Sequence, residues 1–369
     1  MARLTKIEIE GFRSIKQMSL ELGPLNVLIG ANGSGKSNFV SFFKMLNEMM
    51  FETLREYVGK TGWAQSLLHF GPKVTRKIEW VLEFDAGIGR YGYEVRLLPD
   101  QMDTLFIALE GVRFLEAGQA VPDMRWLGTG IPEARIRAEA KQGDPIAQGL
   151  FHLMNQCRVY HFHDTSATAR VRLSCYMGDH RRLLPDAGNM PAMLYHYRHS
   201  QDVVYNRIVS AIRKIMPEFD DFDLEPDGRD QNYLFLNWRQ RGSDYLFGPH
   251  QISDGSLRAM AILTLLLQPE EDLPDVIILD EPELGLHPQA LGLVAGLMRA
   301  ASLKSQLIVA TQSQSLLDYF DPAEIITVES HEGQSTFRRL EPEELKDWLE
   351  DYTIGELWQR NVLGGGPLP

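Results

Sequence analysis

The feature that most constrains this chain is the glycine-rich loop at residues 30 to 37, GANGSGKS, which fits the pattern G-x-x-x-x-G-K-[ST]. The apolar run LNVLI precedes it at residues 25 to 29, and residues 38 to 50 have the character of a helix. A phosphate-binding loop requires this order of strand, loop and helix, because backbone N–H groups and the helix N-terminus must face one anion. The sequence therefore predicts a nucleotide site on an α/β sheet.

The residues of this loop, called the P-loop below, have distinct expected roles. Lys36 reaches the β and γ phosphates of the nucleotide, and the hydroxyl of Ser37 holds Mg²⁺. The other residues expected to bind the nucleotide come from the loop and the start of the helix: Asn32, Gly33, Ser34, Gly35 and Asn38. The alternative, a glycine turn without a ligand, is disfavoured by the strand before it and the helix after it.

A second apolar strand, at residues 275 to 279, ends in Asp280, Glu281 and Pro282. The carboxyl ends of strands are where ligands sit in open α/β sheets. We therefore expect Asp280 to hold Mg²⁺ through water, and Glu281 to orient or deprotonate the water that attacks the γ-phosphate. An apolar strand that ends in two acids is weak evidence alone, but it gains force beside a P-loop.

The composition is that of an ordinary protein with a large core, since 44% of the 369 residues are hydrophobic and 24% are charged. The longest apolar run, at residues 259 to 267, is too short to span a bilayer, and the N-terminus lacks the apolar region of a signal peptide. These features predict a cytoplasmic location. Cys157 and Cys175 do not have a C-x-x-C spacing, so neither a disulfide framework nor a zinc site is supported.

The net charge of -13 argues against broad non-specific binding to nucleic acid, because a polyanion is attracted by summed positive charge. The charge is segregated along the chain. The C-terminal part is acidic at residues 341 to 351, whereas a middle region is rich in basic residues: Arg158, Arg170, Arg172, Arg181, Arg182, Arg198, Arg207, Arg213 and Lys214. A solvated face is the simpler interpretation of either cluster, and a local basic face for DNA stays open.

Hydrophobic periodicity predicts antiparallel strands after the P-loop helix, which is not the pattern of a plain doubly wound sheet. The expected strands are at residues 4 to 9, 18 to 22, 78 to 84, 91 to 97, 104 to 109 and 111 to 116, with a hairpin turn at 85 to 89. Helices are expected within residues 131 to 157, interrupted at Gly143, and two more within 190 to 216. Residues 321 to 363 predict a hairpin and an acidic helix with Trp348 and Trp358, and residues 364 to 369 predict a tail.

A segment just upstream of the acid strand has the residues of a second anion site. Ser253, Asp254, Gly255 and Ser256 open an apolar helix, and small residues at a helix N-terminus bind anions. Because the chain already has its own phosphate loop, a second such site makes sense across a dimer. The alternative is an ordinary Ser/Asp helix cap.

Five short motifs follow one another in a fixed order. They are Gly11-Phe12-Arg13-Ser14-Ile15, the P-loop, the segment at 253 to 256, the acid strand with Glu283-Leu284-Gly285-Leu286-His287-Pro288, and Ala310-Thr311-Gln312-Ser313. On these motifs the chain resembles the ABC-type ATPase heads of the SMC, RecF and OLD group, and more closely the stand-alone predicted ATPases of the AAA_21 or RecF-like kind. The middle of the chain matches more loosely, at residues 160 to 166.

The resemblance implies an α/β fold of the ABC-ATPase head type, with a RecA-like mixed sheet core, an antiparallel β lobe, a helical insertion and no coiled-coil arms. Residues 1–369 would form a single ATPase domain. Within it, residues 1–125 would carry the P-loop and the antiparallel lobe, and residues 126–250 a mainly helical insertion. Residues 251–369 would carry the signature-like segment, the acid strand and a switch lobe with an acidic end.

The resemblance also implies that ATP and Mg²⁺ bind in a homodimer. Each ATP would lie between one subunit's P-loop and Ser253, Gly255 and Ser256 of the other subunit. Arg13 would lie near the nucleotide, although a surface arginine in a turn is an equal alternative.

Two departures from such heads bear on hydrolysis. Gln312 stands where a switch histidine is common; its amide hydrogen-bonds a γ-phosphate or a water but takes up no proton near neutral pH, so slow hydrolysis is expected. The glutamine that often touches Mg²⁺ at the lobe junction has only positional candidates, which are Gln156, His163 and Asp164. His161 and His163 share one face of a predicted strand, and a structural role is favoured over a metal pair.

The leading hypothesis is an ATP-hydrolysing, ATP-dimerised switch that acts in a DNA-linked process with a separate effector, such as a nuclease or a toxin. The resemblance suggests DNA repair or defence against phage as its setting. One alternative is a nucleotide-sensing scaffold that sequesters a partner, with slow or incidental hydrolysis, which Gln312 and the acidic balance favour. A transporter subunit is disfavoured by the antiparallel insertion, and no membrane partner is expected.

Overall fold

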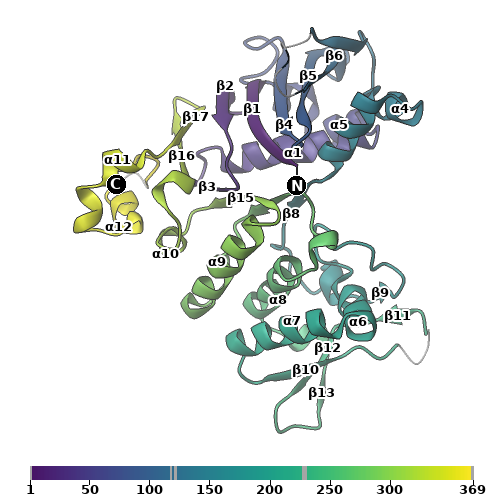
Figure 1. Cartoon of the computed structure of the whole chain (residues 1–369), viewed down its shortest axis with the longest axis vertical. Coiled ribbons are helices and arrows are strands. Elements are labelled where there is room, and N and C mark those ends of the chain that lie inside the picture. Colours follow the sequence, from purple (N-terminus) through teal and green to yellow (C-terminus); the bar gives the residue numbers. More distant parts are fainter. Residues whose placement is uncertain (1, 117–118, 120–122, 227–230, 367–369) are drawn as a thin grey trace. The chain divides into compact units, whose positions relative to one another are not determined.

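The structure is a computed structural model that describes residues 2–116, 119, 123–226 and 231–366 (Figure 1). Its contacts divide the chain into two compact units, each assembled from stretches that are far apart in the sequence. The first unit comprises the chain up to Val159, Pro274–Ile278 and the part from Ser305 onward. The second comprises Tyr160–Leu273 and Leu279–Lys304. The three consecutive segments expected from the sequence stay a prediction.

The first unit contains a six-stranded sheet whose paired strands are antiparallel, in the order β2-β1-β4-β5-β6-β7. The strands are β1 (Arg3–Phe12), β2 (Ile15–Glu21), β4 (Ile78–Asp85), β5 (Gly89–Pro99), β6 (Leu105–Glu116) and β7 (Arg125–Gly128). The predicted hairpin of β4 and β5 is confirmed. It forms because apolar residues alternate along β4, which buries Ile78, Trp80, Leu82 and Phe84 on one face.

One strand prediction in this sheet is wrong. The sequence predicts two strands, at 104 to 109 and 111 to 116, but the structure contains the single strand β6. The pairing of β6 with β7 shifts register between Glu110 and Gly111. Gly111 therefore marks a bulge-like irregularity inside one strand, not the end of a strand.

The core sheet is mixed, as predicted, and has the order β17-β16-β3-β15-β14-β8. Its strands are β3 (Leu25–Ile29), β8 (Cys157–Tyr160), β14 (Val276–Asp280), β15 (Gln306–Thr311), β16 (Ile325–His331) and β17 (Gln334–Arg339). Strand β3 pairs in parallel with both β15 and β16, and β17 returns antiparallel to β16. All five residues of β3 are buried, which explains its unbroken apolar run.

The parallel strands of this sheet start at one edge. The N–H of Leu307 donates to the carbonyl of Pro24 at 2.9 Å, and the N–H of Gln306 donates to the carbonyl of Asp275 at 2.8 Å. The starts of β3, β14 and β15 therefore lie next to one another. Since the strands run the same way, the segments that follow them emerge at the opposite edge, where ligands bind in open α/β sheets.

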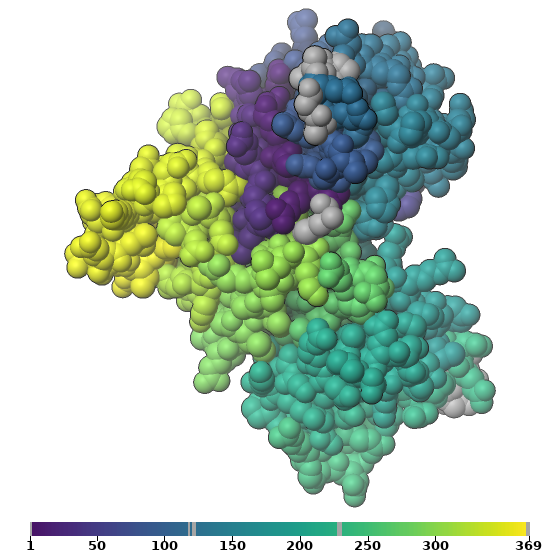
Figure 2. Space-filling view, viewed as in Figure 1, coloured from purple at the N-terminus to yellow at the C-terminus, as the bar shows by residue number. Residues whose placement is uncertain are grey.

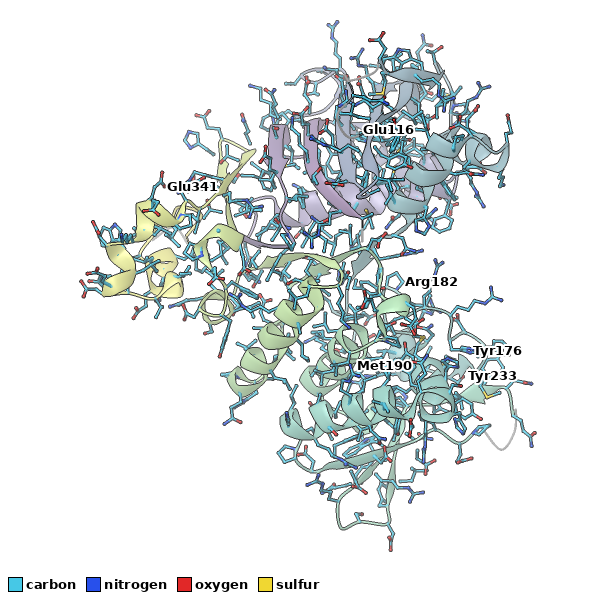
Figure 3. The ribbon with its side chains drawn as sticks, in the orientation of Figure 1. Glu116, Tyr176, Arg182, Met190, Tyr233 and Glu341 are labelled. Atoms are coloured by element: carbon cyan, nitrogen blue, oxygen red, sulfur yellow. The ribbon has the colours of Figure 1, made fainter. Side chains whose placement is uncertain are left out.

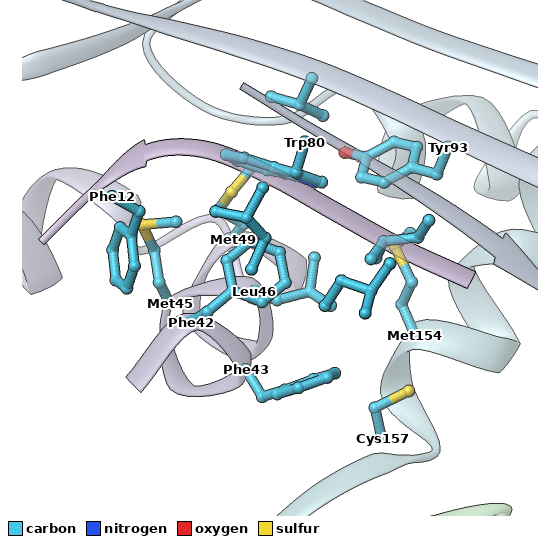
Figure 4. Packing of buried hydrophobic residues seen from close by; sticks show 14 of the residues in the cluster. Phe12, Phe42, Phe43, Met45, Leu46, Met49, Trp80, Tyr93, Met154 and Cys157 are labelled. Atoms are coloured by element: carbon cyan, nitrogen blue, oxygen red, sulfur yellow. The ribbon is translucent and has the colours of Figure 1, made fainter. Parts of the chain in front are cut away.

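Helix α1 (Lys36–Met50) supplies much of the core of the first unit (Figure 4). Its Phe42 ring packs edge-on against Trp80 of β4, with centroids 5.4 Å apart, and against Phe12 of β1 at 6.0 Å. Short helices follow around this core: α2 (Leu54–Lys60), α3 (Trp63–Leu67), α4 (Ile136–Lys141) and α5 (Pro145–Asn155). The break predicted near Gly143 is confirmed, and Asp144 caps α5 by accepting a hydrogen bond from the N–H of Ala147 at 2.7 Å.

The second unit is mainly helical. Its helices are α6 (Met190–Ser200), α7 (Asp202–Ile215), α8 (Asp254–Leu266) and α9 (Pro288–Ser302). The two helices predicted between residues 190 and 216 are confirmed. Small antiparallel pairs accompany them: β9 (Cys175–Tyr176) with β11 (Tyr233–Leu234), and β10 (Phe219–Asp223), β12 (Asn237–Gln240) and β13 (Leu246–Phe247) in one sheet.

The C-terminal part, yellow in Figure 2, differs from its prediction. In place of one acidic helix, the residues after β17 form the short helices α11 (Pro342–Leu345) and α12 (Ile354–Gln359), with Trp348 in a separate 3-10 turn. A further short helix, α10 (Gln314–Leu317), follows β15. Thr353 caps the N-terminus of α12, so a separate helix begins at that point. The predicted tail is wrong for Gly365 and Gly366, which are buried, while residues 367–369 lie outside the described part.

The longest helices in the described part of the chain, α1 and α9, have 15 residues each. Helices of this length form no coiled-coil arms. None of the helices in the described ranges is long and apolar enough to cross a membrane.

Gln306 gives a test of how the two sheets of the first unit are joined. Its buried side chain accepts a hydrogen bond from the N–H of Leu4 at 2.9 Å and donates to the carbonyls of Leu4 at 2.9 Å and Gly23 at 2.8 Å. Gln306→Leu keeps the volume but leaves these buried groups without partners. We expect the free energy of unfolding in urea to fall by about 2–4 kcal/mol. Gln17→Leu on exposed β2 is the control, and equal stability of the two variants would contradict this role.

Candidate functional site

The P-loop connects β3 to α1 and depends on glycine backbone conformations. Gly33 and Gly35 have φ values of 79° and 115°, which favour glycine. A Cβ atom on Gly35 would lie 2.0 Å from Oγ of Ser335 in β17. The pattern predicted from the sequence therefore folds as a loop that lies directly against the β16–β17 hairpin.

The side chain of Lys36 is turned into this loop and is only 5% exposed. Its Nζ donates hydrogen bonds to the carbonyls of Gly30 at 2.6 Å and Ala31 at 3.1 Å. A buried ammonium group needs such acceptors, because an uncompensated buried charge is costly. The loop thus holds a positive charge among backbone groups, while Asn32, Gly33 and Ser37 are exposed.

Arg13 lies in the turn between β1 and β2 with a left-handed φ of 49°. It lines a cavity of about 740 Å³ together with Asn38 of α1. Within the described residues, its buried Nε has no hydrogen-bond partner, so it is a donor suited to an anionic ligand. The sequence analysis missed the other lining residues, which carry no motif: Gln65, Ser66, Leu68, Phe70, Gly71, Pro72 and Lys73.

The acid pair lies at the end of β14, where Asp280 is the last residue of the strand and Glu281 follows it. Glu281 has a left-handed φ of 44°, an uncommon and strained conformation for a residue with a side chain. Nε2 of His163 lies 3.0 Å from the backbone oxygen of Asp280 and 3.9 Å from Oε2 of Glu281. His163 is therefore the lobe-junction candidate that the structure places beside the acids.

The other two lobe-junction candidates lie elsewhere. Asp164 is exposed and accepts a hydrogen bond from the N–H of Ser166 at 3.0 Å. The carbonyl of Gln156 accepts from the N–H of Val276 at 3.1 Å, at the start of β14 and not at its end. The rings of His161 and His163 are 4.0 Å apart, but among the described residues no group of three or more His, Cys, Asp or Glu residues could hold a metal.

Gln312 follows β15 at the edge of the sheet where β3 ends. The register pairs Thr311 with Ile29, so Gln312 and Gly30 each come directly after a paired residue. Gln312 and the P-loop both belong to the first unit. Asp280 and Glu281 belong to the second unit, which takes over from the first within β14, between Ile278 and Leu279.

The signature-like segment, residues 253 to 256, begins α8. Oγ of Ser253 accepts a hydrogen bond from the N–H of Ser256 at 3.2 Å, which makes Ser253 the N-cap of the helix. A Cβ atom on Gly255 would lie 2.1 Å from the carbonyl oxygen of Gly285, so only glycine allows this approach. The segment is therefore a helix cap, as the alternative predicts, and it also contacts the loop after the acid pair.

Arg172 holds the signature-like segment in place by hydrogen bonds. Its buried guanidinium donates to the carbonyls of Thr165, Pro249 and Ile252 and to the carboxylate of Asp254. The hydrogen bond from Arg172 is the main cause that lowers the pKa of the Asp254 carboxyl below its ordinary value.

Arg258, on α8, makes a similar set of contacts. It donates to the carbonyls of Phe162, His163 and Leu284, at 3.3, 2.9 and 3.4 Å, and to Oγ1 of Thr165 at 3.3 Å. Together the two arginines join the segment around His163, the signature-like segment and the loop after Glu281. The sequence analysis found neither role, because it listed Arg172 only among the basic residues and did not name Arg258.

Two family models match the chain. One, described as "AAA domain, putative AbiEii toxin, Type IV TA system", matches residues 159–318, and one described as "AAA ATPase domain" matches residues 3–75. Among solved structures, a Smc head bound to the C-winged helix domain of ScpA is 17% identical with a TM-score of 0.62, over 93% of this chain and 99% of that one. The chain has the fold of an ABC-type ATPase head of the SMC/RecF group.

Two further Smc heads support this fold. One with an extended coiled coil, bound to the C-terminal domain of ScpA and derived from Pyrococcus furiosus, is 15% identical with a TM-score of 0.63, covering 95% of this chain and 99% of that one. One with a coiled coil and joint from Pyrococcus yayanosii is 13% identical with a TM-score of 0.57, over 95% of this chain and 99% of that one. No curated protein matches the chain.

The role of Arg172 in this head is testable by hydrogen exchange. Arg172→Met keeps much of the side-chain volume but removes every donor to the three carbonyls and Asp254. We expect the amides of residues 252 to 257 to exchange about ten- to a hundredfold faster. The amides of β4 and β5 in the first unit are the internal control. Unchanged exchange at 252 to 257 would show that Arg172 does not hold the segment.

Proposed function

We propose that the chain is an ATP-hydrolysing switch that dimerises around ATP. The observation that carries the proposal is the P-loop, in which the buried Lys36 ammonium is held by the carbonyls of Gly30 and Ala31. Both matching family models describe AAA proteins, and the fold is that of an ATPase head. ATP is the nucleotide that fits this loop and fold best.

In this proposal the P-loop residues bind the phosphates and Arg13 reaches the nucleotide from the 740 Å³ cavity. The hydroxyl of Ser37 and the carboxylate of Asp280 each offer oxygen donors, the kind that Mg²⁺ prefers, and the ion would neutralise charge on the β and γ phosphates. Glu281 orients or deprotonates the attacking water. His163 positions Glu281 through its contact with the backbone of Asp280.

The proposed dimer places ATP between one P-loop and Ser253, Gly255 and Ser256 of the other subunit. The exposure of Ser253 and of Asn32 and Gly33 in the P-loop supports this, since both surfaces must be open to a second copy. The N-terminus of α8 supplies N–H groups that favour an anion.

The proposed switch acts in a DNA-linked process with a separate effector protein. The description of the family matched over residues 159–318 names a toxin–antitoxin system, and two similar Smc heads are bound to domains of ScpA. Both descriptions fit a head that works with a partner protein. DNA repair and defence against phage are the two settings we propose.

A surface of the second unit supports contact with DNA. Arg181 and Arg182 are exposed, and their side chains form no ion pair or hydrogen bond with any residue in the described part of the chain. Figure 3 shows Tyr176 and Tyr233 side by side on the strand pair β9–β11, and their ring centroids are 6.1 Å apart. Arginines and exposed aromatic rings are the groups that bind phosphates and unstacked bases.

A nucleotide-sensing scaffold is the second candidate function, because Gln312 follows β15 where a switch histidine is common. A glutamine takes up no proton near neutral pH, so hydrolysis through it is expected to be slow. In the scaffold, ATP holds a dimer that sequesters a partner, and hydrolysis is incidental.

Glu281→Gln tests the ATP-dimerised switch. We expect phosphate release to fall at least about a hundredfold, because the amide cannot accept the proton of the attacking water. The variant should also shift from monomer to dimer in native mass measurements when Mg-ATP is added. Lys36→Ala, which loses the loop ammonium, is the control that should stay monomeric. Wild-type turnover in Glu281→Gln would remove Glu281 from its role, and an unchanged mass would count against the dimer.

Stimulation by DNA separates the switch from the scaffold. At physiological salt, added DNA should raise ATP turnover of the wild type, and Arg181→Glu with Arg182→Glu should lose most of that stimulation while keeping the basal rate. Arg207→Glu, an exposed arginine on α7 with no partner among the described residues, is the matched control. Turnover that DNA leaves unchanged in every variant would favour the scaffold.

A further inference from the structure

Two stretches near the C-terminus contact the P-loop from outside, and no sequence motif covers either of them. One is Ser335 at the start of β17. The other is the glycine segment, Gly364, Gly365 and Gly366, in which the last two residues are buried. The proposed function assigns no role to these residues.

The glycine segment fixes the first peptide of the P-loop. The N–H of Ala31 donates to the carbonyl oxygen of Gly365 at 2.9 Å. In a trans peptide the N–H and the preceding C=O point to opposite sides. Since the N–H of Ala31 points toward Gly365, the carbonyl of Gly30 points the other way, and there it accepts the 2.6 Å hydrogen bond from Nζ of Lys36.

Ser335 fixes a second peptide in the same manner. Its Oγ donates to the carbonyl oxygen of Ser34 at 2.6 Å and lies 2.7 Å from Oγ of Ser14. This contact turns the N–H of Gly35 to the opposite side of the loop, away from β17. The side chain of Ser335 is fully buried, so the hydrogen bond is shielded from competing water.

The glycine segment is itself held by side chains. The N–H of Gly365 donates to Oε1 of Glu329 at 2.6 Å, and the N–H of Gly366 donates to Oδ1 of Asn361 at 3.0 Å. The carbonyl of Leu363 accepts from Nη2 of Arg338 at 3.0 Å. Glu329 therefore acts on the P-loop through one intermediate residue, Gly365.

Glycine is required in this segment. Gly364 and Gly365 have φ values of 79° and 68°. A Cβ atom on Gly364 would lie 2.1 Å from Oε1 of Glu329. The close approach of the segment to Glu329, and hence to Ala31, depends on the missing side chains.

We propose that Glu329 and Ser335 are positioning residues of the nucleotide site. They hold two P-loop peptides from outside, so that the carbonyl of Gly30 faces Lys36 and the N–H of Gly35 faces the bound phosphates. The loop is thereby set for a nucleotide before one binds, which lowers the ordering cost of binding. The inference rests on the proposed function, since it names further residues of the same ATP site.

The test measures the affinity of the full chain for Mg-ATP and Mg-ADP by calorimetry, with turnover measured in parallel. Glu329→Ala removes the acceptor for Gly365 on an exposed side chain, so the variant should fold. Ser335→Ala removes the donor to Ser34. We expect each to raise Kd for both nucleotides about three- to tenfold, the effect of one lost hydrogen bond, while kcat stays within about twofold.

Two matched variants separate positioning from other effects. Glu329→Gln keeps an oxygen that accepts from the N–H of Gly365, so its Kd should stay close to that of the wild type. Thr336→Ala changes the exposed neighbour of Ser335 on β17 and should leave Kd unchanged.

Each outcome decides a different question. Wild-type affinity in both Glu329→Ala and Ser335→Ala overturns the inference. A Kd in Glu329→Gln as high as in Glu329→Ala also overturns it for Glu329, because charge and not hydrogen bonding would then matter. If the wild type itself binds neither nucleotide, the proposed ATP site is contradicted, and this inference falls with it.

Discussion

The contact of the Lys36 ammonium with the carbonyls of Gly30 and Ala31 is the interaction on which the first unit depends. A buried positive charge requires oriented acceptors, and backbone carbonyls turn toward it only when the loop is held in shape. Strand β3 fixes one end of the loop and helix α1 the other. The β16–β17 hairpin and the glycine segment contact the loop from outside through Ser335 and Gly365. Much of the first unit can therefore be understood as support for one loop of eight residues at 30 to 37.

In the second unit, two arginines hold loop segments together by hydrogen bonds to backbone carbonyls. Arg172 and Arg258 take their acceptors almost entirely from backbone carbonyls, in the segments around Thr165, Pro249 and Leu284. Carbonyls in loops lack the partners that regular helices and strands provide, so a guanidinium with five donors stabilises several loops at once. In the proposed dimer, the signature-like segment faces the ATP bound to the partner subunit, while Glu281 acts on the ATP bound to its own subunit. A network that joins the two segments offers a physical route by which the two sites affect one another.

The parts of the site that the sequence predicted are local patterns. The P-loop, the strand that ends in Asp280 and Glu281, and the β4–β5 hairpin each follow from a few consecutive residues, because glycine spacing and apolar alternation act over short distances. Ser335 was not assigned, Gly365 was placed in a tail, and His163 was only one of three positional candidates. The roles of these residues arise from contacts between residues more than a hundred positions apart. The prediction of one C-terminal helix was wrong for a related reason. The composition of this segment favours a helix, but the Thr353 cap and tertiary contacts divide the segment into shorter helices.

Gln312 shows what this arrangement means for the proposed switch. Its register beside Gly30 places it at the edge where the γ-phosphate of a bound ATP would lie. An amide there presents the same donors and acceptor at every pH near neutrality, so the proposed hydrolysis cannot be tuned by protonation of this residue. Control of turnover must then come from geometry: from Glu281 in its strained backbone conformation, from His163 beside it, and from the contacts that set the P-loop. In the proposed switch, the head would stay in its ATP-bound state until a partner or DNA changes that geometry, so the conformational equilibrium and not a proton would set the rate of hydrolysis.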